Sequence, residues 1–393
     1  MKKPSEIVHL PEVPVADDNR PLVAPIYQSV KFEYPDVDET QRALRGERAG
    51  FFYSRSSNPT TRLLEKTLAR MQARDDALVC ASGVAAIAQT LLTLTQTGDH
   101  VLCFAETYGP TRALIRRTLQ RFGVRHTMLS IEDDAGIERV LSTTPTKLVI
   151  FESPTNPITR IADIGHITRC AKAHGAITVL DNTFAGPHQH GDTDIDVFVH
   201  SLTKFASGHG DVMGGAIVAS SALIKRIRPE SVLLGATLDP HAAWLIQRGL
   251  KTYYLRYDAA AESAQRVAEF LAQQDSVSRV HYPGLPQHPR HALARKQMTS
   301  FGSVVSFDLR AGSAAGDRFA DALKLFSVVP SMGSTESLVI PPALMGPRDL
   351  PPELEQLAGI APGTIRLSIG LEDAGDLVAD VAQALEAAGT MAG

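Results

Sequence analysis

The sequence predicts an α/β fold, with a mainly parallel sheet flanked by helices and a smaller α+β domain at the C-terminal end. Two observations indicate this. From residue 59 to about residue 220, short apolar runs alternate with helical stretches, which is typical of a parallel sheet covered by helices on both faces. Beyond about residue 240, long helical patterns prevail over fewer strand candidates. At 393 residues the chain is also too long for one compact core of ordinary size.

We therefore expect three parts along the chain: an N-terminal arm over residues 1–58, a large α/β domain over residues 59–240 and a small α+β domain over residues 241–393. Prolines at positions 4, 11, 14, 21, 25 and 35 interrupt any long element in the arm. Such a segment is either a disordered tail or an arm that lies on another surface. The second reading is favoured by its apolar residues Leu22, Val23, Ile26 and Tyr27.

The elements of both domains follow from local patterns. Asn58 and Pro59 are typical of an N-cap and the first residue of a helix, whose apolar face carries Leu64, Leu68 and Met71. Apolar runs in the large domain predict strands at residues 77–80, 101–104, 148–151, 177–180 and 197–199. The small domain has strand candidates at residues 304–307 and 364–369, and its last helix carries Leu377, Val378, Val381 and Leu385.

Composition narrows the class of protein. The formal net charge of −4 gives no reason to expect nucleic acid or an anionic membrane as a partner, and no stretch is long and apolar enough to span a membrane. The first residues lack the apolar core of a secretory signal, so we expect a cytoplasmic protein. Cys80 and Cys103 lie in apolar runs and are expected to be reduced core thiols. No metal site is expected: His188 and His190 lack a third ligand, and a surface loop is the better reading for them.

Polar residues follow several of the predicted strands. In parallel sheets, ligands bind at the carboxyl ends of the strands. The residues at these ends are Glu152, Asp181 with Asn182, and Ser201 to Lys204. We therefore expect a ligand site at this edge of the sheet.

Lys204 is the first candidate. A lone lysine after a strand is usually a solvated loop residue. Here Ser201 and Thr203 can offer hydroxyl groups to a phosphate, and a glycine-rich run over residues 208–215 permits close approach of the backbone to a ligand. An amine beside a phosphate site suits covalent attachment of an aldehyde cofactor.

Asp181 is the second candidate. It is either a loop cap or the partner of a protonated pyridine nitrogen, which would make the ring of such a cofactor an electron sink.

Gly83 and Val84 open a helix, where free N–H groups bind phosphate; an ordinary strand-to-helix turn is equally compatible. Tyr108 could stack on a flat ring or fill the core. Arg366 lies between apolar neighbours and needs a partner, which is either an internal carboxylate or that of a substrate.

Taken together, these motifs resemble the Cys/Met-metabolism family of fold-type-I pyridoxal-phosphate (PLP) enzymes. The resemblance runs from about Pro25 to the last helix. The matching motifs, in order, are Tyr53–Thr60, Ser82–Ala86, Glu152–Pro157, Asp181–Phe184, Ser201–Lys204, Arg248–Thr252, Glu336–Leu338 and Arg366–Glu372. The resemblance implies a fold-type-I architecture, PLP as cofactor, a sulfur amino acid as substrate and a homodimer or homotetramer.

The resemblance also implies residue roles. Lys204 would carry PLP and transfer protons, Asp181 would pair with the pyridine nitrogen, and Tyr108 would stack on the ring. The phosphate would be held by Ser201, Thr203, Gly83 and Val84, and by Tyr53 and Arg55 from a neighbouring subunit. Asn156 would contact the ring hydroxyl, and Arg366 with Ser331 would bind the substrate carboxylate. The catalytic residues would be Lys204, Tyr108 and Tyr53.

Three positions bear on the reaction. Pro330 stands where the family's cystathionine γ-lyases and γ-synthases usually have glutamate, and Pro110 stands where methionine γ-lyases usually have cysteine. The stretch Ser331–Leu338 is similar to that of cystathionine β-lyases, although Met332 replaces their tryptophan. We expect β-elimination of cystathionine to homocysteine, pyruvate and ammonia.

Two other functions are compatible with these motifs. One is γ-elimination or γ-replacement, as in cystathionine γ-synthase, cystathionine γ-lyase, methionine γ-lyase or O-acetylhomoserine sulfhydrylase. The other is a catalytically inactive regulator that only binds the cofactor. A binding module has no need of a proton-transfer lysine, so the combination of Lys204, Asp181, Tyr108 and Arg366 favours an enzyme.

Overall fold

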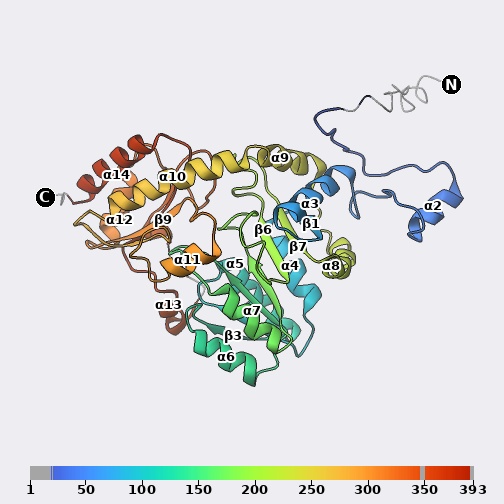
Figure 1. The fold of residues 1–393 in the computed structure, drawn as a ribbon, viewed down its shortest axis with the longest axis horizontal. Helices are drawn as coiled ribbons and strands as arrows, with labels where there is room; N and C mark the ends of the chain where they lie inside the picture. Colours follow the sequence, from blue (N-terminus) through green and yellow to red (C-terminus); the bar gives the residue numbers. More distant parts are fainter. Residues whose placement is uncertain (1–18, 20, 346–349, 390–393) are drawn as a thin grey trace.

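The computed structural model describes residues 19, 21–345 and 350–389, and it contains two β-sheets with helices around them (Figure 1). The larger sheet has the strand order β1-β7-β6-β5-β4-β2-β3. Its strands are β1 (Asp76–Cys80), β2 (His100–Phe104), β3 (Arg125–Leu129), β4 (Leu148–Glu152), β5 (Ile177–Asp181), β6 (Val197–Ser201) and β7 (Gly215–Ala219). Strand β7 is antiparallel to both of its neighbours, and the other pairs are parallel. The predicted α/β class and mainly parallel sheet are confirmed.

Helices cover this sheet on both faces. They are α3 (Pro59–Met71), α4 (Gly83–Leu94), α5 (Gly109–Ala113), η1 (Leu114–Thr118), η2 (Leu119–Phe122), α6 (Asp134–Thr143), α7 (Ile164–Ala173), α8 (Ser221–Leu234) and α9 (Pro240–Leu250). Val149 and Phe151 of β4 belong to one hydrophobic cluster, whereas Leu148 and Ile150 belong to another. Successive side chains of a strand point to opposite faces. Both faces of β4 are therefore buried, which explains why its sequence is an unbroken apolar run.

The second sheet is smaller and mainly antiparallel. Its order is β10-β11-β12-β9-β8, with β8 (Val277–His281), β9 (Val304–Leu309), β10 (Ser327–Val328), β11 (Leu338–Ile340) and β12 (Thr364–Ser368). Its helices are α11 (His291–Gln297), α12 (Ser313–Ala322), η3 (Pro342–Leu344), α13 (Pro352–Ala358) and α14 (Ala374–Gly389). Helix α14 buries Leu377, Val381 and Leu385, as its predicted apolar face requires.

Helix α10 (Tyr253–Leu271) connects the two sheets. Its first turns place Tyr253 and Tyr257 in a hydrophobic cluster of the large sheet, and its last turns place Val267 and Leu271 in the cluster of the small sheet. Because one continuous helix contributes to both cores, the two sheets are held in a fixed relation, which the site between them requires.

The arm projects away from the body (Figure 1). Residues 1–18 and 20 lie outside the described residues. The described part contains one helix that the sequence analysis did not predict, α2 (Val37–Leu44), which buries none of its residues. Leu22 is fully exposed, and Val23 is half-exposed. Within a single chain, these apolar side chains are therefore exposed, although burial against another surface would be favourable.

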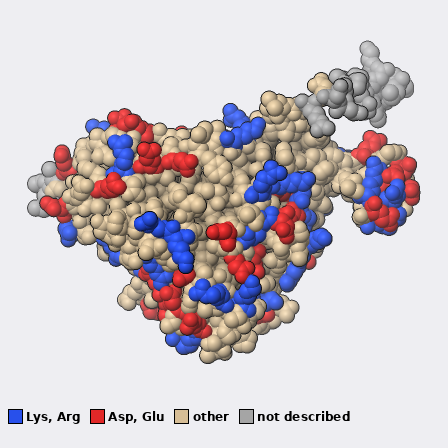
Figure 2. Space-filling view, viewed as in Figure 1, with Lys and Arg blue, Asp and Glu red and all other residues tan. Residues whose placement is uncertain are grey.

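Several local predictions are confirmed. Asn58 is the N-cap of α3, and its side chain accepts a hydrogen bond of 2.8 Å from the Thr60 N–H. Cys80 and Cys103 are buried free thiols. No helix among the described residues has the length and apolarity to cross a membrane. Basic and acidic side chains are interspersed over the face shown in Figure 2.

The surface-loop prediction for His188 and His190 is wrong. His190 is buried, and its Nδ1 lies 2.8 Å from Oδ1 of Asn182. Burial lowers the pKa of His190 to about 3, so it is neutral. His188 is partly buried, and its Nδ1 lies 2.7 Å from the hydroxyl of Tyr253. The Nδ1 atom of each ring has a partner that local spacing does not reveal, whereas Nε2 of His190 is buried without a hydrogen-bond partner.

The buried carboxylate of Glu65 joins α3 to α8. Only 3% of its surface is exposed, and it accepts hydrogen bonds from Arg62 (2.8 Å) and Arg228 (3.0 and 3.2 Å). We expect Glu65→Ala to lower the free energy of unfolding by about 3 kcal/mol, because it leaves two partly buried cations without this partner. Urea denaturation would measure this loss.

The matched control is Asp194→Ala, which removes the pair between Lys172 and Asp194. Both side chains of this pair are exposed, and exposed pairs contribute little to stability. Its unfolding midpoint should stay close to that of the unmodified protein. Equal midpoint shifts in the two variants would contradict the role assigned to Glu65.

Candidate active site

A cavity of about 400 Å³ lies where the carboxyl ends of β4, β5 and β6 face the small sheet. It is lined by Ser82, Gly83, Val84, Ile87, Tyr108, Glu152, Asn156, Asp181, Thr183, Phe184, His200, Ser201, Thr203, Lys204, Met213, Pro330, Ser331, Met332, Ile340 and Arg366. The lining includes ten of the twelve residues that the sequence analysis assigned to the site.

Asp181 ends β5 and is buried. Its Oδ1 accepts hydrogen bonds from the N–H (3.1 Å) and the hydroxyl (2.6 Å) of Thr183. Burial raises the pKa of Asp181, and the two Thr183 hydrogen bonds oppose this rise. Among the described residues no cation forms an ion pair with Asp181. A buried carboxylate without a cation suits a cationic ligand.

Glu152 is a site residue to which the sequence analysis gave no role. It ends β4 directly beside Asp181 of β5. Burial, with Asp181 as the next cause, raises its pKa well above the usual value, while the N–H groups of Tyr108 and Asn156 oppose the rise by donating to it. Glu152 thereby fixes the backbone at two cavity-lining residues. Its position at a strand end was visible in the sequence, but the pairing of β4 with β5 was not.

Lys204 follows β6 by three residues and is partly buried. Its Nζ donates a hydrogen bond of 2.8 Å to Oγ of Ser331, a residue of the small-sheet region. Burial, and secondly the charge of Arg366, lower the pKa of Lys204. A lowered pKa increases the share of neutral amine at neutral pH, and the neutral amine is the form that attacks an aldehyde or accepts a proton.

Arg366 lies in β12 and is buried. Its Nη1 donates to Oδ1 of Asn156 (2.8 Å), and its Nη2 donates to the carbonyl oxygen of Ser331. Its Nε has no hydrogen-bond partner, and no carboxylate of the described residues pairs with it. Burial lowers the pKa of Arg366 to about 10, so it remains charged at neutral pH. The alternative of an internal ion pair therefore finds no partner in the described part of the chain.

The N-terminus of α4 meets the end of β6. Ser82 is the N-cap and accepts from the Ala85 N–H at 3.1 Å, which leaves the N–H groups of Gly83 and Val84 without an intrahelical acceptor. A Cβ atom at Gly83 would lie 2.7 Å from Cβ of Ser201. Glycine is therefore required for this close approach, which brings free N–H groups beside a serine hydroxyl in a corner suited to phosphate.

Two further predicted residues complete the lining. Thr203 lies in the same corner, and its Oγ1 accepts from the Gly214 N–H at 3.1 Å. Tyr108 is the N-cap of α5 and is 41% exposed, so its phenol is accessible from the cavity. Burial, and secondly Asp181 and Glu152, raise its pKa. Its phenol is therefore protonated at neutral pH.

Tyr53 and Arg55 do not line the cavity of their own chain. Both lie in the arm, where the Arg55 guanidinium is 5.5 Å from the centroid of the Tyr53 ring. Sequence reasoning assigned them to a neighbouring subunit, which a single chain does not test.

Sequence reasoning missed other lining residues. Thr183 orients Asp181, and an Asp-x-Thr pattern after a strand was its available signal. His200 is buried, its Nε2 lies 2.9 Å from Oε1 of Gln72, and burial lowers its pKa to about 3. An apolar wall is formed by Phe184, Met213, Pro330, Met332 and Ile340; the sequence analysis used Pro330 and Met332 only to compare reactions, and Met213 and Ile340 carried no signal beyond ordinary hydrophobicity.

The residues present fit PLP on three counts. An unpaired buried carboxylate, Asp181, suits the protonated ring nitrogen. The helix N-terminus at Gly83, next to Ser201, suits the phosphate. The amine of Lys204, with a lowered pKa, suits the aldehyde.

Comparison with known proteins points the same way. A profile of the family described as Cys/Met metabolism PLP-dependent enzymes matches residues 7–386. An L-methionine gamma-lyase from Pseudomonas putida is 44% identical over 375 residues, which cover 94% of each chain. A cystathionine beta-lyase from Lactococcus lactis is 38% identical over 365 residues, which cover 92% of this chain and 93% of the relative.

Solved structures agree in fold. A Campylobacter jejuni enzyme assigned as an O-acetylhomoserine (thiol)-lyase, which carries a pyridoxyl-lysine phosphate group, has a TM-score of 0.88 and 32% identity. The match covers 94% of this chain and 96% of that chain. A cystathionine gamma synthase from Xanthomonas oryzae, in complex with cystathionine, has a TM-score of 0.88, 34% identity and 93% coverage of each chain. The predicted fold-type-I architecture is confirmed.

Arg366 provides a test of substrate binding. Arg366→Lys keeps the charge but loses the two-pronged donor that fits a carboxylate. We expect kcat/KM for the amino-acid substrate to fall by about two powers of ten, the loss typical of a charge-assisted pair. The cofactor absorbance and the melting temperature should change little. Steady-state kinetics and thermal melting would measure both.

The control is Arg310→Lys, at the exposed end of the same sheet, which should leave kcat/KM unchanged. If Arg366→Lys instead melts at a markedly lower temperature and its folded fraction turns over normally, Arg366 has a structural role and the carboxylate binds elsewhere.

Proposed function

Because the chain belongs to the Cys/Met metabolism family of PLP-dependent enzymes and has PLP as its cofactor, we propose that it is a lyase that cleaves a carbon–sulfur bond of a sulfur amino acid. One observation carries this proposal. Ser331 accepts from Lys204 through its hydroxyl and from Arg366 through its carbonyl, so a proton-accepting amine lies beside a carboxylate-binding guanidinium.

The reaction follows from that juxtaposition. Bound PLP supplies an aldehyde that joins the substrate amine and a ring that withdraws electrons from the substrate's Cα. A substrate carboxylate on Arg366 would place the Cα proton near Nζ of Lys204, whose amine would accept that proton. Asp181 would keep a proton on the ring nitrogen, and the protonated phenol of Tyr108 could donate to the departing sulfur.

The position of the cleaved bond depends on the far side of the cavity. The described lining includes the five residues of the apolar wall, and its only lysine and arginine are Lys204 and Arg366. An amino acid with an uncharged thioether end, such as methionine, fits this wall. The 44% identity to an L-methionine gamma-lyase supports the same choice. We propose γ-elimination of methionine to methanethiol, 2-oxobutyrate and ammonia as the primary reaction.

Cystathionine β-elimination, which the sequence analysis predicted, is the second candidate. It is supported by the 38% identical cystathionine beta-lyase and by Pro330, which stands where cystathionine γ-lyases and γ-synthases usually have glutamate. Cystathionine has a second charged end, and the described lining offers that end no cation. Arg55 of a neighbouring arm is the residue that could supply one.

We also propose that the active unit is at least a dimer, with a tetramer as the fuller assembly. The arm projects from the body, and its apolar residues are exposed in a single chain. The wall of the cavity contains neither Tyr53 nor Arg55. A neighbour's arm would both cover those apolar residues and bring this pair to the phosphate corner.

Product identity tests the reaction. With methionine, the proposal predicts 2-oxobutyrate and methanethiol in equal amounts; with cystathionine, pyruvate and homocysteine would show β-elimination.

The unmodified protein should absorb in the visible range, and borohydride should remove this band. Lys204→Ala should abolish turnover because no other described lysine lines the cavity. Absence of any 2-oxo acid from either substrate would refute the lyase proposal.

Subunit complementation tests the arm. Arg55→Ala and Lys204→Ala should each be inactive alone, but mixing them under conditions of subunit exchange should restore up to about a quarter of full activity, because half of the dimers are hybrids with one intact site of two. Arg45→Ala, an exposed arginine of the same arm, should remain active and is the control. Complete exchange without restored activity would place Arg55 in its own chain's site or outside it.

A further inference from the structure

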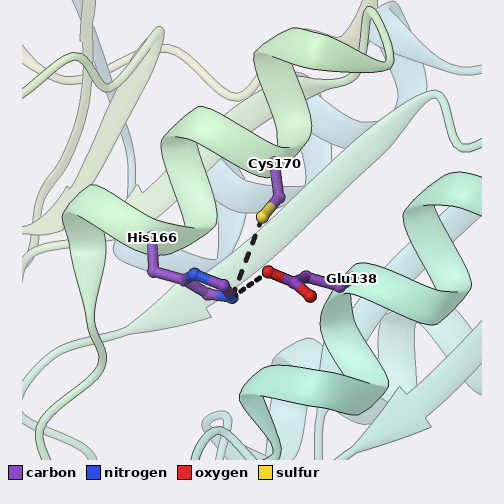
Figure 3. Close-up of side chains that lie close together, drawn as sticks. All are labelled: Glu138, His166 and Cys170. Carbon is purple, nitrogen blue, oxygen red and sulfur yellow. Dashed lines mark hydrogen bonds and ion pairs between the residues drawn. The ribbon is translucent and has the colours of Figure 1, made fainter.

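Helices α6 and α7 pack side by side, outside the cavity that binds PLP (Figure 1). His166 and Cys170 are four residues apart on α7, so both side chains lie on the same face of that helix. Glu138 on α6 points toward them (Figure 3). His166 and Cys170 are partly buried, and Glu138 is exposed. None of the three has a part in the proposed reaction.

The three side chains converge on the same point without close contacts between them. Nε2 of His166 lies 3.7 Å from Sγ of Cys170 and 3.9 Å from Oε1 of Glu138. The three ligand atoms all lie within 4.8 Å of one another. The backbone oxygen of Asp134 lies 3.4 Å from the same nitrogen. The separation of His166 from Cys170 is that of a weak hydrogen bond to sulfur, whereas the 3.9 Å between His166 and Glu138 exceeds the range of about 2.7–3.2 Å for a hydrogen bond between nitrogen and oxygen.

A shared metal ion explains the spacing better. Zinc binds nitrogen and oxygen at about 2.0–2.2 Å and sulfur at about 2.3 Å in tetrahedral geometry, so bound ligand atoms lie about 3.4–3.6 Å apart. The separation of His166 from Cys170 is already close to this value. The carboxylate of Glu138 must move closer to both His166 and Cys170, and its side chain is 63% exposed and free to move.

The set of ligands indicates the kind of metal. Thiolate and imidazole ligands favour zinc and neighbouring transition metals over calcium and magnesium, which take oxygen ligands. We propose that Glu138, His166 and Cys170 form a zinc-class metal site that clamps α6 to α7. Three protein ligands leave a fourth position, which water can fill because the cluster is open to solvent.

The sequence analysis expected no metal site because it looked for histidine pairs and paired cysteines. His166 and Cys170 carry the spacing of a chelating pair on a helix, but Glu138 is distant in the sequence and reaches them only through the packing of α6 against α7. The cluster also contains the most accessible of the three cysteines. Of the chain's three cysteines, Cys80 and Cys103 are buried in the core, and Cys170 alone is accessible to a metal from solvent.

Metal titration of the PLP-loaded protein tests the site. Calorimetry with zinc should show one ion bound per chain, and the melting temperature should rise with zinc concentration, because binding to the folded state stabilises it. Cobalt should give the visible ligand-field bands of a tetrahedral site with a thiolate ligand, in difference spectra against the cobalt-free protein. Cys170→Ser and His166→Gln should each weaken zinc binding at least about tenfold.

His174→Gln is the matched control, since His174 is an exposed histidine at the end of the same helix. It should bind zinc as the unmodified protein does. Circular dichroism and melting in the absence of metal would verify that the variants are folded. Absence of zinc binding at micromolar metal, or binding that survives both Cys170→Ser and His166→Gln, would overturn the proposal. These outcomes do not bear on the lyase reaction, which uses other residues.

Discussion

The site depends on the contact of one residue, Ser331, with two cations from different parts of the fold. Its hydroxyl accepts from Lys204, which follows β6 of the large sheet, and its carbonyl accepts from Arg366, which lies in β12 of the small sheet. The relative position of the two sheets must therefore be maintained closely enough to keep both hydrogen bonds. Helix α10, which contributes to both hydrophobic cores, provides that rigidity. Catalytic geometry of this precision generally needs support from rigid elements.

The large sheet concentrates the remaining chemistry. Because β4, β5 and β6 are parallel neighbours, their carboxyl ends place Glu152, Asp181 and the segment that leads to Lys204 along one edge. Antiparallel β7 returns beside β6 and begins at Gly215, where a Cβ atom would lie 2.0 Å from the Ser82 oxygen. That close approach packs β7 against the N-terminus of α4, next to the corner suited to phosphate. The sheet thus fixes the positions of the cofactor residues before any loop contributes.

Asp181 and Arg366 could be found from the sequence because they stand at the end of or within an apolar strand, where a charge needs a partner, and Lys204 because Ser201, Thr203 and a glycine-rich run surround it. Glu152 could be located but not interpreted, since its role depends on the pairing of β4 with β5. The burial of His190 depends on Asn182 and could not be read from spacing. The wall residues Met213 and Pro330 come from loops whose course no local pattern records. The division into domains, and the roles of Tyr53 and Arg55, remain predictions.

The charges of the cavity also determine how a substrate lies in it. Asp181 and Glu152 place two carboxyl groups on one side, and both have raised pKa values because burial penalises the charged form. Lys204 and Arg366 bring positive charge to the other side, and both have lowered pKa values for the same reason. Each pair is unfavourable until an opposite charge arrives. A cationic ring nitrogen would relieve the first pair and a substrate carboxylate the second, so these charges favour one orientation of cofactor and substrate.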